Sequence, residues 1–189
     1  PGSELFTGNI LMSIGVRERK YSLAKVLRNW LIVYLGNLVG AIIIAKLVAS
    51  SGLLVNSGNL TSTGEVAVNI AQAKMQLGFG EAFSRGILCN MLVCLAVIMS
   101  IASRTVTGKI FGIYFPIMTF ASSGYEHSVA NMYFLPAGLM AKGEFLSGFL
   151  GMFNNLIPVT LGNIIGGLLI VLLHPKMEEH LARIFRWIK

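Results

Sequence analysis

The stretch SSGYEHSVAN, from Ser122 to Asn131, interrupts an otherwise apolar segment that extends from Ile110 to Ala141. The composition indicates the environment of this break. Of the 189 residues, 54% are hydrophobic and only 12% are charged, and the mean hydropathy is +0.72. Soluble domains carry about 25% charged residues, and a soluble fold of this size cannot bury so many apolar side chains. We therefore predict an integral membrane protein in which the break lies at membrane depth.

Unbroken membrane spans are predicted in three other places. Crossing the hydrocarbon core takes about 20 mostly apolar residues, and three segments meet this condition: Val26–Ala49, Gly86–Ala102 and Phe149–Leu173. Leu5–Val16 is only half a span, and the more polar residues 50–81 predict an outward loop with some interfacial helix. A break at membrane depth is tolerated only where the freed backbone faces protein or a watery cavity. The sequence thus predicts an all-α multispan membrane protein with a pore or a site near residues 122–128.

The segments around the break recur earlier in the chain. The pattern G-x-E-x-x-x-x-N occurs at Gly2–Asn9 and again at Gly124–Asn131, and Asn29–Gly40 shares six identical residues with Asn155–Gly166. An odd number of spans separates the two copies, so they cross the membrane in opposite directions. We predict an inverted repeat in which two broken helices meet at the midplane, where such folds place their binding sites.

The repeat also predicts a segment before residue 1. In the second copy, a complete span (Gly86–Ala102) and a half-span (Ile110–Phe120) precede the G-x-E pattern, whereas the first copy starts at Gly2. We expect that a first span and the leading half of the second are absent from this chain, and that the natural protein has six spans. The chain, 1–189, is then a single transmembrane channel domain with four parts: a truncated repeat one at about 1–49, an outer loop at about 50–81, repeat two at about 82–175, and a cytoplasmic C-terminal tail at 176–189.

Basic residues mark one face of the predicted membrane protein. Eleven of the 15 Lys and Arg lie at alternate ends of the apolar segments: Arg17, Arg19, Lys20, Lys25, Arg28, Arg104, Lys109, Lys176, Arg183, Arg186 and Lys189. The positive-inside rule makes this face, and with it the C-terminus, cytoplasmic. The other face holds only Lys46, Lys74, Arg85 and Lys142. A net charge of +7 placed in this way indicates contact with the lipid bilayer and no nucleic-acid partner.

Three motifs resemble those of the formate–nitrite transporter family of pentameric anion channels. They are ELFTGN at Glu4–Asn9, SGYEHSVANM at Ser123–Met132, and NLIPVTLGNIIGG at Asn155–Gly167. The resemblance extends from Gly2 to about Leu173. It implies an aquaporin-like fold of six spans, with one pore in each protomer of a homopentamer, in a bacterial inner or plasma membrane. The family's members pass formate, nitrite or hydrosulfide.

The same resemblance implies roles for single residues. Thr7 and His127 are the facing polar pair of the pore, Leu5 and Phe6 belong to one apolar constriction, Phe120 lines the other, and Lys74 stands at the outer vestibule. The family's first span and the loop before Gly2, which supply further constriction residues, are missing from this sequence.

Residue chemistry indicates how such a pore lowers the barrier to an anion. An unpaired ion in hydrocarbon costs many kcal/mol. The half-helices that begin near Leu5 and Ser128 would aim their positive amino ends at the midplane, and an imidazole such as that of His127 titrates near neutral pH. We expect that His127 either stabilises the anion electrostatically or protonates it, and that Thr7 holds the imidazole or the anion through its hydroxyl.

The remaining polar residues are expected to be mostly structural. Glu4 and Glu126 occupy equivalent repeat positions, and a carboxylate repels an anion, so we expect both to accept hydrogen bonds from the loop backbone. Five amides are expected to tie the broken helices together: Asn9, Asn37, Asn90, Asn131 and Asn163. Asn90 and Asn131 are also candidates for contact with the pore, and Lys74 is either an attractor of anions or an ordinary loop lysine.

The predicted function is a channel for small monovalent anions of weak acids, formate first, with nitrite or hydrosulfide close behind. An aquaporin-type channel for neutral solutes also suits two half-helices, but the paired Asn-Pro-Ala signature is absent. An intramembrane hydrolase would combine Ser122, Ser123 or Ser128 with His127, yet no orienting acid stands at a recognisable spacing and no H-E-x-x-H motif occurs. We predict no enzymatic activity, no cofactor and no metal site, because Cys89 and Cys94 lie inside an apolar run.

The expectation of a preceding segment can be tested on the gene. A span, a half-span and a linker need roughly 50 to 80 residues, so we expect an open reading frame that is longer by about this number before Pro1. Sequencing upstream of the codon for Pro1 checks this, and a start codon immediately before it would contradict the expectation.

Overall fold

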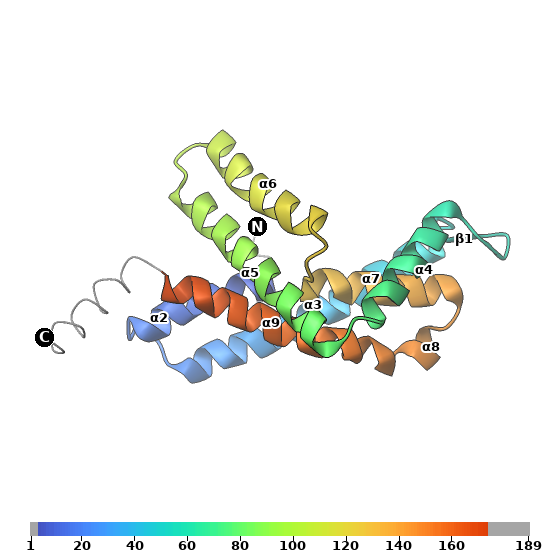
Figure 1. Ribbon diagram of the computed structural model, residues 1–189, viewed down its shortest axis with the longest axis horizontal. Helices are drawn as coiled ribbons and strands as arrows, with labels where there is room; N and C mark the ends of the chain where they lie inside the picture. Colours follow the sequence, from blue (N-terminus) through green and yellow to red (C-terminus); the bar gives the residue numbers. More distant parts are fainter. Residues whose placement is uncertain (1–3, 174–189) are drawn as a thin grey trace, which may run out of the picture.

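The computed structural model describes residues 4–173, and the expected tail at 176–189, with Lys176, Arg183, Arg186 and Lys189, lies outside them. Apart from one short hairpin, the regular structure is helical (Figure 1). The elements are α1 (Phe6–Asn9), the 3-10 turn η1 (Ile10–Met12), α2 (Ser13–Arg17), α3 (Leu23–Ser50), β1 (Val55–Asn56), β2 (Asn59–Leu60), α4 (Ser62–Met75), α5 (Phe79–Ala102), α6 (Val106–Ser122), α7 (Ser128–Lys142), α8 (Phe145–Gly148), η2 (Leu150–Met152) and α9 (Phe153–Leu172).

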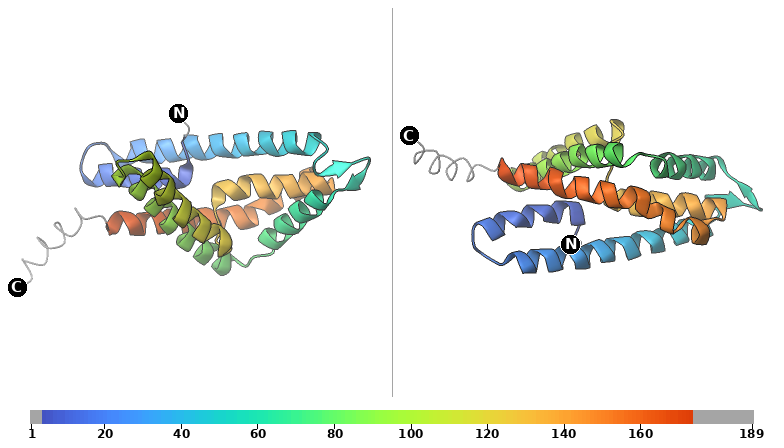
Figure 2. Two further views of the ribbon diagram at one scale, coloured as in Figure 1. Left: turned by 90° about the horizontal axis from the view of Figure 1, so that it is seen from above. Right: turned by 60° about the horizontal axis from the view of Figure 1, so that its bottom comes forward.

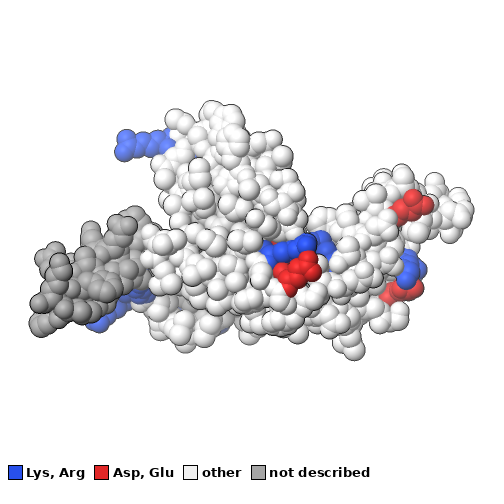
Figure 3. All heavy atoms as spheres, in the orientation of Figure 1, with Lys and Arg blue, Asp and Glu red and all other residues white. Residues whose placement is uncertain are grey.

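The three predicted spans are confirmed as long apolar helices. Leu23–Ser50, Phe79–Ala102 and Leu150–Leu172 are each long and apolar enough to cross a membrane. In α3 only 6% of the most apolar window is buried inside the structure, and Leu31 and Leu47 are each at least 60% exposed. Such an apolar surface is stable against lipid or another apolar helix, not against water. Few charged side chains interrupt the face that Figure 3 shows.

The predicted break is also confirmed. Helix α6 ends at Ser122, and α7 begins at Ser128. Between them Gly124 has φ +67°, a left-handed conformation that glycine adopts without the strain a side chain would cause. The turn separates α6 from α7 and leaves His127 at the amino end of α7.

The two half-helices point away from each other. The helical stretch 6–17 runs from the centre toward one end of the molecule, while α7 runs from the centre toward the other end (Figures 1 and 2). The long helices α3 and α9 also run in opposite directions, and α5 packs along α9 while α3 packs along α7. These directions agree with the inverted arrangement expected from the sequence repeat.

The polar segment after α3 is more than a surface loop. Residues 55–60 form a two-stranded antiparallel hairpin, in which Val55 pairs with Leu60. Helix α4 then returns from the hairpin toward the centre along α7 (Figure 1). Thr61 caps α4, because its side chain accepts a hydrogen bond from the N–H of Gly64 over 3.0 Å. The helix expected in this segment is α4. Its last turn, which includes Lys74, lies next to the break between α6 and α7.

Glycines let α5 and α9 approach each other closely. A Cβ atom added at Gly162 would lie 2.2 Å from the carbonyl oxygen of Phe83, and one added at Gly166 would lie 2.2 Å from that of Ile87. Their repeat equivalents in α3, Gly36 and Gly40, meet nothing within 4 Å. Gly162 and Gly166 thus lie at a close helix crossing, whereas a Cβ atom added at Gly80, in the first turn of α5, meets nothing within 4 Å.

This difference predicts unequal effects of one substitution. We expect Gly162→Ala to lower the free energy of unfolding by at least about 1–3 kcal/mol, because its Cβ would overlap the α5 backbone. Gly80→Ala, the matched control, should be neutral or slightly stabilising, because its Cβ meets nothing within 4 Å and alanine has the higher helix propensity. Thermal unfolding of the two variants in detergent measures both effects, and equal melting temperatures would contradict the described packing of α5 on α9.

Candidate functional site

His127 lies where the chain breaks between α6 and α7. It is the N-cap residue of α7, with an extended backbone at φ −110° and ψ 114°. Its Nε2 atom is 3.0 Å from Oγ1 of Thr7, which belongs to the first turn of the opposite half-helix. The exposed fraction is 7% for His127 and 0% for Thr7. The pair therefore joins the amino ends of both half-helices in the interior of the fold.

The hydrogen bonds of His127 determine which ring nitrogen carries the proton. The backbone N–H of Ala130 donates to Nδ1 over 3.1 Å, so Nδ1 is an acceptor and the neutral ring carries its hydrogen on Nε2. This Nε2–H donates to Oγ1 of Thr7. A hydroxyl that accepts one hydrogen bond retains its own hydrogen. Thr7 therefore has a donor to offer to a small ligand.

Apolar side chains lie next to this polar pair, either in contact with it or adjacent in sequence. The ring of Phe120 stacks on the imidazole of His127, with 5.6 Å between the centroids and 14° between the planes. Leu5 is 42% exposed, whereas Phe6 is 3% exposed and packs edge-to-face on Tyr34 at 5.0 Å. Phe120 thus lies where an apolar constriction would adjoin the polar pair. Phe6 contributes to core packing here, and its role in a constriction stays a prediction.

Glu126 organises a second cluster, directly before His127. Its Oε1 atom accepts a hydrogen bond from the ammonium group of Lys74 over 2.7 Å, and its Oε2 atom accepts from the side-chain amides of Asn131 and Asn155. The sequence predicts backbone donors from the loop, but the donors to this carboxylate are side chains of α4, α7 and α9. The physical reason is that a buried carboxylate needs strong donors, preferably a cation, to offset its desolvation.

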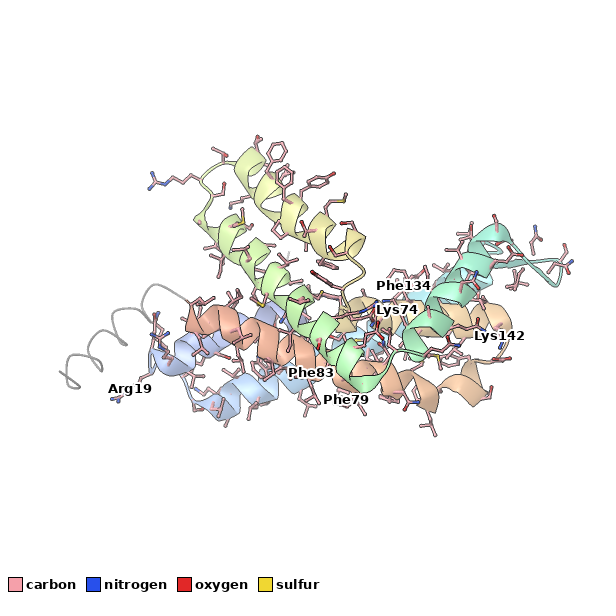
Figure 4. All side chains as sticks on the ribbon, viewed as in Figure 1. Arg19, Lys74, Phe79, Phe83, Phe134 and Lys142 are labelled. Atoms are coloured by element: carbon pink, nitrogen blue, oxygen red, sulfur yellow. The ribbon has the colours of Figure 1, made fainter. Side chains whose placement is uncertain are left out.

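Lys74 is largely buried, and its place at an outer vestibule stays a prediction. Its side chain is 17% exposed, and its Glu126 partner is 4% exposed. The ammonium group also lies 5.9 Å from the centroid of the Phe134 ring (Figure 4). The charge of Lys74 is therefore largely neutralised by Glu126, and attraction of anions by Lys74 stays a prediction.

Glu4 has a matching cluster just before the opposite half-helix. Its Oε2 atom accepts from the side-chain amides of Asn9 and Asn29 over 2.6 and 3.0 Å, and Asn9 also donates to Oδ1 of Asn29. The repeat equivalents Asn131 and Asn155 form the same mutual bond over 2.7 Å. The two carboxylates are therefore held by equivalent amides, in agreement with the offsets of the sequence repeat.

Two further asparagines bind the backbone that the breaks set free. Oδ1 of Asn163 accepts from the N–H of Ser128 over 2.9 Å, and its Nδ2 donates to the carbonyl group two residues before Ser128 over 3.0 Å. Asn37 makes the same two bonds, from the N–H of Phe6 at 3.0 Å and to the carbonyl group two residues before it at 3.1 Å. Both predicted ties between broken helices and spans are thus present.

Asn90 of α5 reaches the pair from one side. Its Nδ2 atom donates to the carbonyl oxygens of Thr7 and Asn163 over 3.2 and 2.6 Å. Within residues 4–173, three buried side-chain atoms lack a hydrogen-bond partner: Oδ1 of Asn90, Oδ1 of Asn131 and Oγ of Ser128. An amide oxygen accepts and does not donate, so it does not attract an anion. The Ser128 hydroxyl can donate a hydrogen bond. The two amide oxygens can only accept one, for example from water or from a protonated acid.

The bonds of His127 also bear on the hydrolase alternative. Both ring nitrogens are taken, by Thr7 and by the N–H of Ala130, and no serine–histidine hydrogen bond occurs in the described part of the chain. The same residues contain no group of three or more His, Cys, Asp or Glu side chains that could hold a metal ion. The described geometry lacks the nucleophile–base pair that hydrolysis of this kind requires.

Sequence reasoning misses Asn29 and Asn155 as partners of the two glutamates, and it does not pair Lys74 with Glu126. Asn29 and Asn155 are identical residues at equivalent positions of the repeat, and that identity is the signal that could have found them. The Lys74–Glu126 ion pair joins residues 52 positions apart in different helices, and no local pattern marks it.

Comparison with known proteins places this site in a family context. The family model described as "Formate/nitrite transporter" matches residues 1–176. A protein of Methanothermobacter thermautotrophicus named "Probable formate transporter" is 45% identical over 182 residues, which cover 90% of this chain and 66% of that protein. "Formate channel FocA" of Escherichia coli is 38% identical over 190 residues, covering 90% of this chain and 65% of its own length. The chain thus spans slightly less than two thirds of these relatives.

Solved structures show the same fold. A structure titled "FNT family ion channel" has a TM-score of 0.77 and 34% identity, over 90% of this chain and 67% of that chain. Another, titled "Pentameric formate channel with formate bound", has a TM-score of 0.70 and 32% identity, over 98% of this chain and 76% of that one.

The buried ion pair predicts a strong effect of removing one charge. We expect Glu126→Gln to destabilise the fold by about 3–5 kcal/mol, because Lys74 is left as an enclosed cation without a counter-charge. Glu81→Gln is the matched control, since it breaks the exposed Glu81–Arg85 pair and should change stability by less than about 1 kcal/mol.

Thermal unfolding in detergent measures both losses. The double variant Lys74→Met/Glu126→Gln should recover part of the stability of Glu126→Gln, because no unpaired charge remains. A Glu126→Gln variant as stable as Glu81→Gln would refute the structural role of the pair.

Proposed function

This chain belongs to the formate/nitrite transporter family, and we propose that it conducts small monovalent anions of weak acids, formate first, through a pore where its two half-helices meet. The observation that carries this proposal is the buried Thr7–His127 hydrogen bond at the amino ends of both half-helices. The names of the relatives and of the solved structure that contains formate support formate as the first substrate to test.

The local electrostatics suit an anion. The amino end of α7 carries partial positive charge from its backbone N–H groups, and the opposing half-helix begins beside it. The nearest carboxylate, Glu126, is occupied by Lys74 and two amides, so its charge is offset within its own cluster. An anion that arrives between the half-helices thus meets dipoles and hydroxyl donors, which can replace part of its hydration shell.

Thr7 is the donor that we assign to the anion. Its hydroxyl accepts from Nε2–H of His127 and keeps its own hydrogen for the substrate. His127 is then a positioning residue in its neutral form, because it orients the Thr7 hydroxyl and also caps α7 through Nδ1. This arrangement favours electrostatic stabilisation over protonation of the anion, since a ring protonated on Nδ1 would lose its bond to the Ala130 N–H. Formate, nitrite and hydrosulfide all present one negative charge to such a donor.

Ring stacking by Phe120 supplies the selectivity for small solutes. The ring covers one face of His127, and an apolar side chain at such a point hinders the passage of hydrated or large ions. Leu5 is exposed and lies two residues before Thr7 in the sequence. We assign it to the same constriction. We propose further that the protein works as a homopentamer in the plasma membrane, and that the face with the basic residues between Arg17 and Arg28 is cytoplasmic. The pentameric solved structure and the positive-inside rule support this.

Substitution of Thr7 tests the proposal directly. We expect Thr7→Val, which keeps the shape and removes the hydroxyl, to lower formate flux by roughly 10- to 100-fold, the equivalent of a hydrogen bond to a charged group. Thr7→Ser should retain most of the flux. Thr119→Val on α6, whose hydroxyl bonds its own helix backbone, is the control. Flux into liposomes is measured with formate, nitrite and hydrosulfide side by side, using the protein in its natural length.

Replacement of His127 separates the two mechanisms. His127→Asn retains a side chain that can cap α7, and under electrostatic stabilisation it should reduce formate flux without abolishing it and with little change in pH dependence. Loss of pH dependence together with loss of flux would instead support protonation of the anion. Equal passage of chloride or of large anions by the unmodified protein would refute the proposed selectivity.

A further inference from the structure

A groove at the hairpin end of the molecule is not used by the proposed pore. It has a volume of about 940 Å³, which is within the range of ligand pockets. Its walls come from the last two turns of α3, the β hairpin, the end of α7 and the start of α8, which Figure 1 shows together at one end. The residues that matter for its chemistry are Ile42, Lys46, Ser50, Lys142, Phe145 and Leu146.

The charges around the groove leave an excess of one positive charge. Lys142 forms an ion pair with Glu144 over 2.8 Å, while Lys46 has no ion pair with any of the described carboxylates. The sequence predicts two further cations on the same membrane face, Lys74 and Arg85. Both are neutralised, because Lys74 pairs with Glu126 and Arg85 with Glu81. Lys46 is thus the cation of this face that lacks a counter-charge in residues 4–173.

The groove is polar at its outer edge and apolar beneath it. Lys46 lies four residues before the end of α3 at Ser50, or about 6 Å along the helix axis. Ile42 follows one turn deeper, and Leu146 is 89% exposed on the opposite wall. A lysine at this depth extends its ammonium group toward the headgroup layer. An amphipathic molecule would satisfy both parts of the groove at once.

We propose that this groove binds a monoanionic phospholipid, with its phosphate at Lys46 and Lys142 and an acyl chain along Ile42 and Leu146. The net charge of the lysines and Glu144 matches one negative charge, which favours a phosphatidylglycerol-type lipid over a zwitterionic lipid. A free phosphate ion would use the lysines alone and leave the apolar walls without a role. The site is separate from the Thr7–His127 pair, so the proposal does not depend on anion conduction.

Native mass spectrometry of the purified protein, in its natural length and assembly, tests this proposal. Phosphatidylglycerol and phosphatidylcholine of equal chain length are the probes. We expect tighter retention of phosphatidylglycerol, and a loss of about fivefold in its affinity for Lys46→Gln, the effect of one basic residue near an anionic lipid. Lys25→Gln is the matched control, because it removes the same charge from an exposed site at the opposite end of α3.

Two further measurements identify the class of ligand. Ala49→Trp fills the groove without a change of charge and should weaken retention as much as Lys46→Gln, while circular dichroism and gel filtration verify folding. Excess inorganic phosphate should not displace the lipid. The proposal is overturned by equal losses for Lys46→Gln and Lys25→Gln, by full displacement with phosphate, or by retention that none of the variants alters, as expected if a second copy of the chain covers the groove.

Discussion

The need to satisfy backbone polar groups inside an apolar protein is the constraint on which this structure depends. Each half-helix that begins inside the fold leaves N–H and C=O groups where lipid would offer them no partner. Asn163 and Asn37 provide that partner, because each side-chain amide bonds an N–H at the start of a half-helix and a carbonyl group just before it. The starts of the half-helices are thus held by two long unbroken helices, α9 and α3.

The buried carboxylates extend this support to the rest of the bundle. Glu126 links α4, α7 and α9 through Lys74, Asn131 and Asn155, and Glu4 repeats the amide part of the arrangement at the other break. Negative charge so close to the proposed anion path would be unfavourable if it were free, but here each carboxylate has donors. The hydroxyl and imidazole of the central pair therefore determine the local chemistry, together with the amino ends of the half-helices.

How far the sequence predicts such a site depends on the range of each signal. The break at residues 122–128 was visible because polar residues interrupt an apolar run, and the roles of Asn37 and Asn163 follow from identical positions in the repeat. The Lys74–Glu126 pair and the stack of Phe120 on His127 were not derivable from any pattern of spacing. They depend on where α4 and α6 pack, which propensity and hydropathy do not specify.

The sequence by itself determined the apolar, membrane-type composition, the spans and the break at residues 122–128, because hydropathy and backbone satisfaction act locally along the chain. It also determined which residues of the two copies correspond. Only the tertiary structure decided that Nδ1 of His127 caps α7 and Nε2 meets Thr7, and that Phe6 turns into the core. It likewise decided that Gly162 and Gly166 lie where α5 crosses α9 closely. Such choices arise from contacts between distant segments, whose geometry depends on the packing of whole helices.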